Sequence, residues 1–430
     1  MLERYFGLRA HGTDLRTELL AGLTTFLTMA YILVVNPDIL AAAGMPREAV
    51  FVATCLAAAL GSAVMGLYAN YPIALAPGMG LNAYFAFVVV QGMGFPWQAA
   101  LGAVFLSGCL FIIISLLRLR EWIVNAIPHS LKLAISAGIG LFLALIGLQN
   151  AGIIVGHPAT LLTLGDLHQP GPLFAIAGLL LIVALQARRI TGGIVLGILL
   201  VTAIAVLLGH APFRGVVAAP PSLAPTWLQL DIRAALDAGL IAVVLTFFLV
   251  ELFDATGTLV GVCHRAGLLD AEGKLPRLNR ALLADSTAIA AGAALGTSST
   301  TAYIESAAGT AVGGRTGLTA VVVALLFLLA LFLAPLAATV PGFATAPALI
   351  YVAVLMVRGL AELDWEDLTE SAPAVICAVS MPFCFSIAHG IAFGFISYAG
   401  IKLLAGRWRE VGPAVWVIAA VFTAKFIWLT

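Results

Sequence analysis

Charged residues are scarce in this chain. Only 10% of its 430 residues are Asp, Glu, Lys or Arg, whereas 62% are hydrophobic. Soluble globular proteins carry about 25% charged residues, so this chain has too few polar side chains to cover a water-exposed surface. Its 21 basic and 21 acidic residues balance, which leaves no basic excess for binding nucleic acid. The composition predicts an all-α protein that crosses a membrane many times.

Cysteine is also scarce. The five cysteines are isolated from one another at 55, 109, 263, 377 and 384, a spacing that gives neither a disulfide framework nor a paired zinc motif. The histidines lie in loops or near the ends of apolar stretches, without the spacing of metal ligands. We therefore expect no metal and no cofactor.

Apolar stretches divide the chain into fourteen predicted spans, several of them shorter than the roughly 20 residues that a helix needs to cross a bilayer. They are 17–36, 48–69, 72–93, 97–117, 129–150, 171–187, 190–209, 238–262, 279–296, 299–313, 317–340, 343–360, 370–387 and 388–405. The residues before the first span include acids as well as bases, unlike a signal peptide, so we expect this span to be retained. A last apolar segment, 411–428, fits either a fifteenth span or a helix at the membrane interface.

The basic residues test this threading. With the N-terminus inside, three of them fall outside the cell, namely Arg47, Arg214 and Arg233, and Lys425 lies within the last apolar segment. The cytoplasmic side receives Arg4, Arg9, Arg16, Arg118, Arg120, Lys132, Arg188, Arg189, Arg265, Lys274, Arg277, Arg280, Arg315, Arg358, Lys402, Arg407 and Arg409. This asymmetry agrees with the positive-inside rule. It predicts a multi-pass protein of the cell membrane, in a bacterium the inner membrane, with a cytoplasmic N-terminus.

A long Pro-containing loop at 210–237 separates seven predicted spans from seven. Two copies of a unit with an odd number of spans must lie in opposite orientations across the membrane. The equal division therefore predicts an inverted repeat, which is common in transporters.

Three carboxylates fall deep within predicted spans, where a charge costs about 2.5–3.5 kcal/mol. Glu251 and Asp254 are three residues apart and share one helix face, and Glu305 lies in GTSSTTAYIESAAG. Neither motif contains Lys or Arg. The structural alternative is a protonated carboxyl bonded to a neighbouring helix. Three such residues on two segments favour a site for a polar ligand.

Two segments resist continuous helix inside the membrane. The Ser/Thr run 297–301 precedes a short helical stretch at 303–313, and Pro72 and Pro77 precede a second one that Asn82 opens. Two half-helices beginning at mid-membrane would present N–H donors to a ligand. Ordinary kinks with packed hydroxyls are the alternative.

A three-residue segment and one further acidic residue are assigned structural roles. Asn36, Pro37 and Asp38 are expected to cap the outer end of the first span, and Asp285 to anchor the ninth span near the cytoplasmic bases.

The chain resembles one family closely, the AzgA-type purine-base permeases of the nucleobase/ascorbate transporter (nucleobase–cation symporter 2) superfamily. The resemblance covers about residues 1–410 and rests on long motifs in the same order. These are NPDIL, APGMGLNAYFAF, LFDATGTLVGV, GTSSTTAYIESAAG and, at 381–395, MPFCFSIAHGIAFGF.

This resemblance implies a fold of two inverted seven-span repeats, with short strands breaking spans 3 and 10. A core domain would comprise 1–120 and 237–341, a gate domain 121–236 and 342–410, and an extra C-terminal helix 411–430. It also implies a purine site between the two half-helices and span 8. The substrate-binding residues carried over are Leu81, Asn82, Glu251, Asp254, Thr301, Ile304 and Glu305.

The function implied is purine import, of adenine, hypoxanthine or guanine, by proton symport and alternating access, with sodium as the other candidate ion. Proton coupling is assigned to Asp254 or Glu251. The expected partners are a purine base, protons, the lipid bilayer and a second copy in a homodimer, with no nucleic acid.

Rival functions are open to the same sequence. A transporter of the same fold could carry xanthine, uracil or a sulfate-like anion, although an anion site should place positive charge at the half-helices and none occurs there. No ring of pore-lining residues suggests a channel. An intramembrane enzyme could use the Ser/Thr run as nucleophile, yet neither central motif supplies a His as base.

Overall fold

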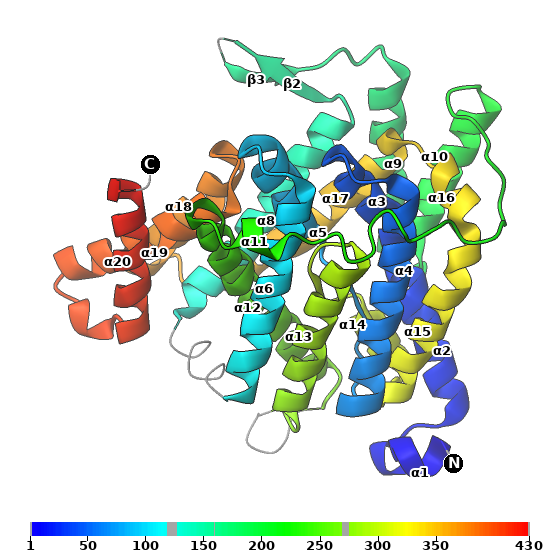
Figure 1. Cartoon of the computed structure of the whole chain (residues 1–430), viewed down its shortest axis with the longest axis horizontal. Helices are drawn as coiled ribbons and strands as arrows, with labels where there is room; N and C mark the ends of the chain where they lie inside the picture. Colours follow the sequence, from blue (N-terminus) through cyan, green and yellow to red (C-terminus); the bar gives the residue numbers. More distant parts are fainter. Residues whose placement is uncertain (1, 118–126, 159, 269–274, 429–430) are drawn as a thin grey trace. The chain divides into compact units, whose positions relative to one another are not determined.

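The computed structural model describes residues 2–117, 127–158, 160–268 and 275–428 (Figure 1). The described chain divides into two compact units, Met1–Leu117 with Asp166–Ala348, and Arg118–Gly165 with Leu349–Thr430. The predicted boundary between residues 120 and 121 and the bases Arg118, Arg120 and Lys274 lie outside the described residues. The division into core and gate domains stays a prediction.

The first unit consists mainly of helices formed by the apolar stretches. Its helices of ten or more residues are α2 (Leu15–Met29), α3 (Ile32–Ala42), α4 (Arg47–Val64), α6 (Trp97–Leu116), α9 (Pro170–Ala187), α10 (Gly193–Leu207), α12 (Ala238–Arg265), α13 (Leu278–Leu295) and α15 (Gly317–Ala330). The shorter ones are α1 (Leu2–Phe6), α5 (Met79–Ala83), α11 (Ile232–Ala235), α14 (Ser306–Val312) and α16 (Ala334–Thr339). Helix α17 (Gly342–Val357) starts in this unit and continues past its end.

The second unit contains α8 (His129–Asn150), α18 (Leu368–Phe383), α19 (Ile387–Leu404), α20 (Pro413–Trp428) and a hairpin of β2 (Ile154–His157) with β3 (Leu161–Leu164). Lys402 is 1% exposed and forms ion pairs with Glu370 at 2.8 Å and Glu410 at 2.7 Å. Tyr398 also donates a hydrogen bond to Glu370, over 3.0 Å. Helix α20, which covers most of 411–428, packs on α19.

Many of the helices are apolar enough to lie in a membrane. Eight of those described are both long and apolar enough to cross one, and five shorter apolar helices accompany them. The chain is therefore a multi-pass, mainly helical membrane protein. The number of fourteen crossings, the inverted repeat and the orientation of the N-terminus stay predictions.

Two very short strands replace helix where the sequence predicts breaks. Strand β1 (Leu75–Pro77) pairs antiparallel with β4 (Thr300–Ala302), with Ala76 opposite Thr301. Gly78 N donates to Ser299 O over 2.8 Å and continues the pairing beyond the strand ends. Each strand leads into a short helix, β1 into α5 and β4 into α14. The predicted breaks in segments 72–93 and 299–313 are thus confirmed.

Helices α4, α12 and α13 pack around this two-stranded sheet, and the π-helical turn Met65–Ala69 packs against α4 and α13. Their buried apolar side chains form one cluster with Ile73 and Leu75 of the first break and Ala302 of the second. Exposed backbone groups within a bilayer are costly unless protein surrounds them. The cluster supplies that protein environment.

A close backbone contact joins the π-helical turn to α15. A Cβ atom on Gly317 would overlap the backbone of Gly66, so glycine is required where the two segments cross. The buried side chain of Glu18, from α2, lies at the start of α15. Its carboxylate accepts hydrogen bonds from the backbone N–H groups of Arg315, Thr316 and Thr319 over 2.8, 3.2 and 3.0 Å, and from the Thr319 hydroxyl over 2.6 Å. A carboxylate at a helix N-terminus stabilises the unpaired N–H groups and the helix dipole.

Candidate functional site

The seven predicted site residues lie on three segments of the first unit. Leu81 and Asn82 lie on α5, Glu251 and Asp254 on α12, and Thr301, Ile304 and Glu305 on β4 and the turn into α14. The turn between β1 and α5 connects them. A Cβ built on Gly78 would lie 2.9 Å from Cγ2 of Thr301 and 4.0 Å from Oδ2 of Asp254. The structure therefore brings Asp254 and Thr301 to one point beside the start of α5.

Asn82 is held by a buried amide on α3. Its Nδ2 donates to Oδ1 of Asn36 over 2.5 Å, and Nδ2 of Asn36 donates to the hydroxyls of Thr54 and Thr297 over 2.7 and 2.9 Å. The expectation that Asn36 caps the first span is wrong, because α3 continues to Ala42. Asn36 instead links α5 to the Ser/Thr run before β4. The sequence signal for such a role is an amide side chain within an apolar span, since a polar group there needs a hydrogen-bond partner.

Glu305 is held by two residues near the break between α2 and α3. The hydroxyl of Tyr31, at the break between α2 and α3, donates to Oε1 of Glu305 over 2.5 Å. The hydroxyl of Thr28 donates to the backbone carbonyl of Glu305 over 3.4 Å. The two apolar residues of the predicted site differ in exposure. Ile304, next to Glu305, is 46% exposed, whereas Leu81, next to Asn82, is 2% exposed.

Glu251 contacts a different helix from Asp254. Its Oε2 accepts a hydrogen bond from the hydroxyl of Ser107 on α6, over 2.5 Å, and its side chain is fully buried. Asp254 lies one turn further along α12, beside Gly78. The two carboxylates that share a helix face in the sequence thus lie in different surroundings.

Several polar atoms around β4 are buried with few partners. Within the described residues, no hydrogen bond to protein forms at the hydroxyls of Ser298, Ser299, Thr300 and Thr301 or at Oδ1 of Asn82. Buried polar groups are nearly always hydrogen-bonded in folded proteins. Of these residues, Thr301 and Asn82 are among the predicted site residues, whereas the hydroxyl of Thr300 lies against Gly292 of α13.

Asp285 supports the site from behind the sheet. Its Oδ1 accepts a hydrogen bond from the backbone N–H of Ala302 in β4, over 3.1 Å, and the residue is fully buried. The expectation that Asp285 anchors the cytoplasmic end of its span is therefore wrong. On the opposite strand, the Ser62 hydroxyl accepts from Leu75 N over 2.9 Å and donates to Leu75 O over 3.1 Å. Asp285 and Ser62 satisfy the outer edges of the two strands.

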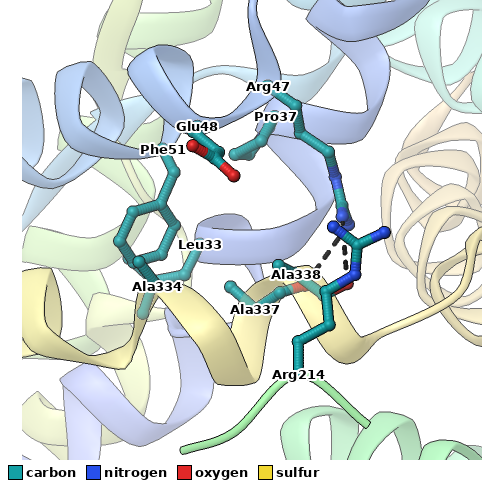
Figure 2. A pocket seen from close by; sticks show the side chains of 9 residues that line it. All are labelled: Leu33, Pro37, Arg47, Glu48, Phe51, Arg214, Ala334, Ala337 and Ala338. Carbon is teal, nitrogen blue, oxygen red and sulfur yellow. Dashed lines mark hydrogen bonds between the residues drawn. The ribbon is translucent and has the colours of Figure 1, made fainter. Parts of the chain in front are cut away.

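A separate cavity of about 110 Å³ lies in the same unit at the junction of α3, α4 and α16 (Figure 2). Arg47 and Arg214, two of the bases predicted outside, both line it. Arg47 pairs with Asp38 at 2.6 Å and donates to the carbonyls of Ala337 and Ala338 over 3.3 and 3.4 Å, which ties α16 to the α3–α4 connection. The predicted site residues do not line this cavity.

Metal binding finds no support in the described ranges, which contain no cluster of three or more His, Cys, Asp or Glu side chains. The chemistry of the site is that of carboxylates, amides, hydroxyls and backbone groups.

The profile of the Permease family matches residues 16–393, a range that includes every element of the site. The chain belongs to this family. Relatives of known name are purine permeases, as the sequence motifs predict. The chain is 52% identical to the adenine permease AdeP of Escherichia coli, over 100% of this chain and 96% of the relative. It is 47% identical to the guanine/hypoxanthine permease PbuG of Bacillus subtilis, over all of both chains. The resemblance to purine-base permeases is thereby confirmed.

Solved structures show the same fold at low sequence identity. The transmembrane domain of the cyanobacterial bicarbonate transporter BicA matches this permease with a TM-score of 0.65 and 18% identity, over 89% of this chain and 97% of that one. This similarity concerns the fold alone.

Proposed function

We propose that this permease imports purine nucleobases. Relatives named for adenine and for guanine and hypoxanthine align with its whole length. The observation that carries the proposal is the pairing of β1 with β4 beside Asp254. It brings together amide, hydroxyl and carboxylate groups from sequence motifs that contain no Lys or Arg. Such a set suits a neutral ring with donors and acceptors on its edge. It does not suit an anion, and it supports a transporter rather than an enzyme.

Hydrogen-bond acceptors and donors of the protein both take part in binding the base. Glu305 and Asp254 accept from ring or exocyclic N–H groups. The hydroxyl of Thr301, the amide of Asn82 and main-chain groups of 79–82 and 301–305 pair with the remaining ring atoms. Leu81 and Ile304 supply apolar contact with the ring faces, since purines are flat and apolar above and below their plane.

Proton coupling belongs to α12 in this proposal. Glu251 and Asp254 lie one turn apart, Glu251 against Ser107 and Asp254 at the substrate groups. Protonation neutralises a carboxylate and lowers the cost of carrying it across the apolar barrier. One of the two carboxyls therefore takes up a proton from outside and releases it inside for each base that is transported. Sodium is the alternative coupling ion.

The finer architecture follows from the same proposal. Fourteen spans form two inverted repeats, and a core of 1–120 with 237–341 moves against a gate of 121–236 with 342–410. The protein lies in the cell membrane as a homodimer with its N-terminus in the cytoplasm. The segment 411–428 forms an additional helix.

Uptake of radiolabelled adenine, hypoxanthine and guanine in a host without its own purine permeases tests the function. Wild-type protein should accumulate purines, and a protonophore should abolish accumulation while replacement of sodium should not. Glu305→Ala should lose uptake, because it removes the acceptor for the ring N–H. Glu366→Ala, which changes an exposed carboxylate of the second unit, is the matched control.

Membrane abundance must be equal in both variants. Undiminished purine uptake by Glu305→Ala would refute the assigned site. Absence of purine uptake by the wild type, with uptake of xanthine, uracil or an anion instead, would refute the purine proposal.

A further inference from the structure

One helix, α3, contacts both of the breaks that form the site. Tyr31 lies at its start, and the hydroxyl donates to Oε1 of Glu305 over 2.5 Å, immediately before α14. Asn36 lies further along α3, and its Oδ1 accepts from Nδ2 of Asn82 on α5 over 2.5 Å. A helix rises about 1.5 Å per residue, which places the two positions about 7.5 Å apart along the axis. Helix α3 thus holds α5 at one level and the start of α14 at another.

The second break is attached to α3 on both sides of its strand. Nδ2 of Asn36 donates to the hydroxyl of Thr297, which precedes β4, over 2.9 Å. Glu305, the partner of Tyr31, follows β4. The segment between Thr297 and Glu305 therefore has two attachments to α3 in addition to its pairing with β1.

Helix α3 is itself held firmly in the first unit. Tyr31 and Asn36 are 1% and 0% exposed, and most apolar side chains of α3 are buried. Asn36 also donates to the hydroxyl of Thr54 on α4 over 2.7 Å, and α3 packs on both α4 and α5. Close-packed interiors resist deformation, so α3 can impose a fixed distance on the segments that are bonded to it.

We propose that α3 is a spacer helix that sets the distance between α5 and the start of α14, and that Tyr31 and Asn36 are its two positioning residues. The role rests on the proposed purine function, in which Asn82 and Glu305 bind the base. It holds whichever atoms of the base face these two residues. A spacer fixes a distance only while both of its attachments are intact, and this property distinguishes it from two separate hydrogen bonds.

Equilibrium binding of radiolabelled adenine and hypoxanthine to detergent-purified protein tests the spacer in Tyr31→Phe, in Asn36→Leu and in the double variant. Both substitutions are close in size to the residue they replace and remove its hydrogen bonds. Each single variant should raise Kd about tenfold, which corresponds to the loss of a buried hydrogen bond. The double variant should stay within about twofold of the weaker-binding single variant, because release of one attachment already frees the distance.

Separate local roles predict a different result for the double variant. If Tyr31 served only Glu305 and Asn36 served only Asn82, the two effects would multiply, and Kd would rise about a hundredfold. Any rise clearly beyond twofold over the single variants would overturn the spacer. A wild-type Kd in either single variant would overturn it as well.

Two control variants separate positioning from stability. Tyr398→Phe also removes a phenol–carboxylate hydrogen bond, but to Glu370 in the second unit. Asn70→Gly removes an amide that bonds the Phe6 carbonyl and the Gly317 N–H within the first unit, at a φ of 54° that suits glycine. Both should keep the wild-type Kd, whatever their melting temperatures. A raised Kd in Asn70→Gly would mean that Kd follows stability, and would overturn the assignment.

Should Asn36→Leu be absent from the membrane, Thr297→Val replaces it. This change removes the contact of Asn36 with the second break and leaves its contact with Asn82. Kd should rise about threefold in wild-type background and by no more than about twofold in Tyr31→Phe; the opposite pattern, or no rise at all, would overturn the spacer. Failure of the wild type to bind or transport any purine would instead refute the proposed function, so the two failures are distinguishable.

Discussion

Replacement of Glu18 by alanine should destabilise the first unit more than other changes of a single carboxylate. The side chain is fully buried on α2, and its two oxygens accept three backbone N–H groups and one hydroxyl at the start of α15. Alanine leaves these donors without an acceptor inside an apolar core. Each stranded polar group costs about 1–3 kcal/mol.

Partial relaxation lets some donors find other partners, so we expect a net loss of about 3 kcal/mol rather than the full sum. For a unit of this size, that loss corresponds to a melting temperature lower by about 5 °C. Glu18→Gln should recover only part of the loss, because its amide keeps one acceptor but turns two donors toward other donors.

Thermal unfolding of detergent-purified protein measures this effect. Glu3→Ala is the control, because Glu3 is an exposed carboxylate near the same end of the chain that accepts one hydrogen bond, from Arg9 N over 3.0 Å. It should melt within about 1 °C of wild type. Equal melting temperatures for Glu18→Ala and Glu3→Ala would refute the reasoning, since they would mean that the buried carboxylate contributes no more than an exposed one.

Two further predictions concern backbone crossing and acid stability. Gly317→Ala should lower the melting temperature and the yield of folded protein, because its methyl group overlaps the backbone of Gly66; wild-type stability in this variant would contradict the close contact. Hydrogen bonding to Arg407 lowers the pKa of Glu410 to about 2, so the stability from this pair is present above pH about 4.3 and is lost as the pH falls toward 2. Melting curves from pH 7 to 3 should therefore show a smaller acid-induced decrease in Arg407→Ala than in wild type, whereas Arg409→Ala should behave as wild type. Parallel curves for all three proteins would exclude the pair as a source of acid sensitivity.

The sequence was most informative where local chemistry opposes helix. Pro72 and Pro77 predict the break that contains β1, and the Ser/Thr run predicts the break that contains β4. The carboxylates Asp254 and Glu305 are visible in the sequence because charge is rare within apolar spans. These features depend on neighbours in the sequence, so a single chain reveals them.

Long-range partners were not predictable in this way. Tyr31 bonds to Glu305, which is 274 residues away, and Asn36 bonds to Thr297, 261 residues away. Asp285 was interpreted from the bases near its own span, whereas its partner is a backbone N–H in β4. Periodicity and hydropathy describe how a segment meets the membrane. They do not say which other segment it meets.

The pairing of β1 with β4 also has a consequence for the order of events during synthesis. The partner strand of β1 lies about 225 residues further along the chain, which a ribosome translates in roughly 10–45 seconds at about 5–20 residues per second. During that interval Ser62, on the neighbouring helix α4, can already bond both backbone groups of Leu75. Before β4 is synthesised, the backbone groups of Leu75 on one edge of β1 can therefore already be hydrogen-bonded to Ser62. The purine site is completed only after the second strand emerges, so nascent chains that end before residue 302 should be unable to bind substrate.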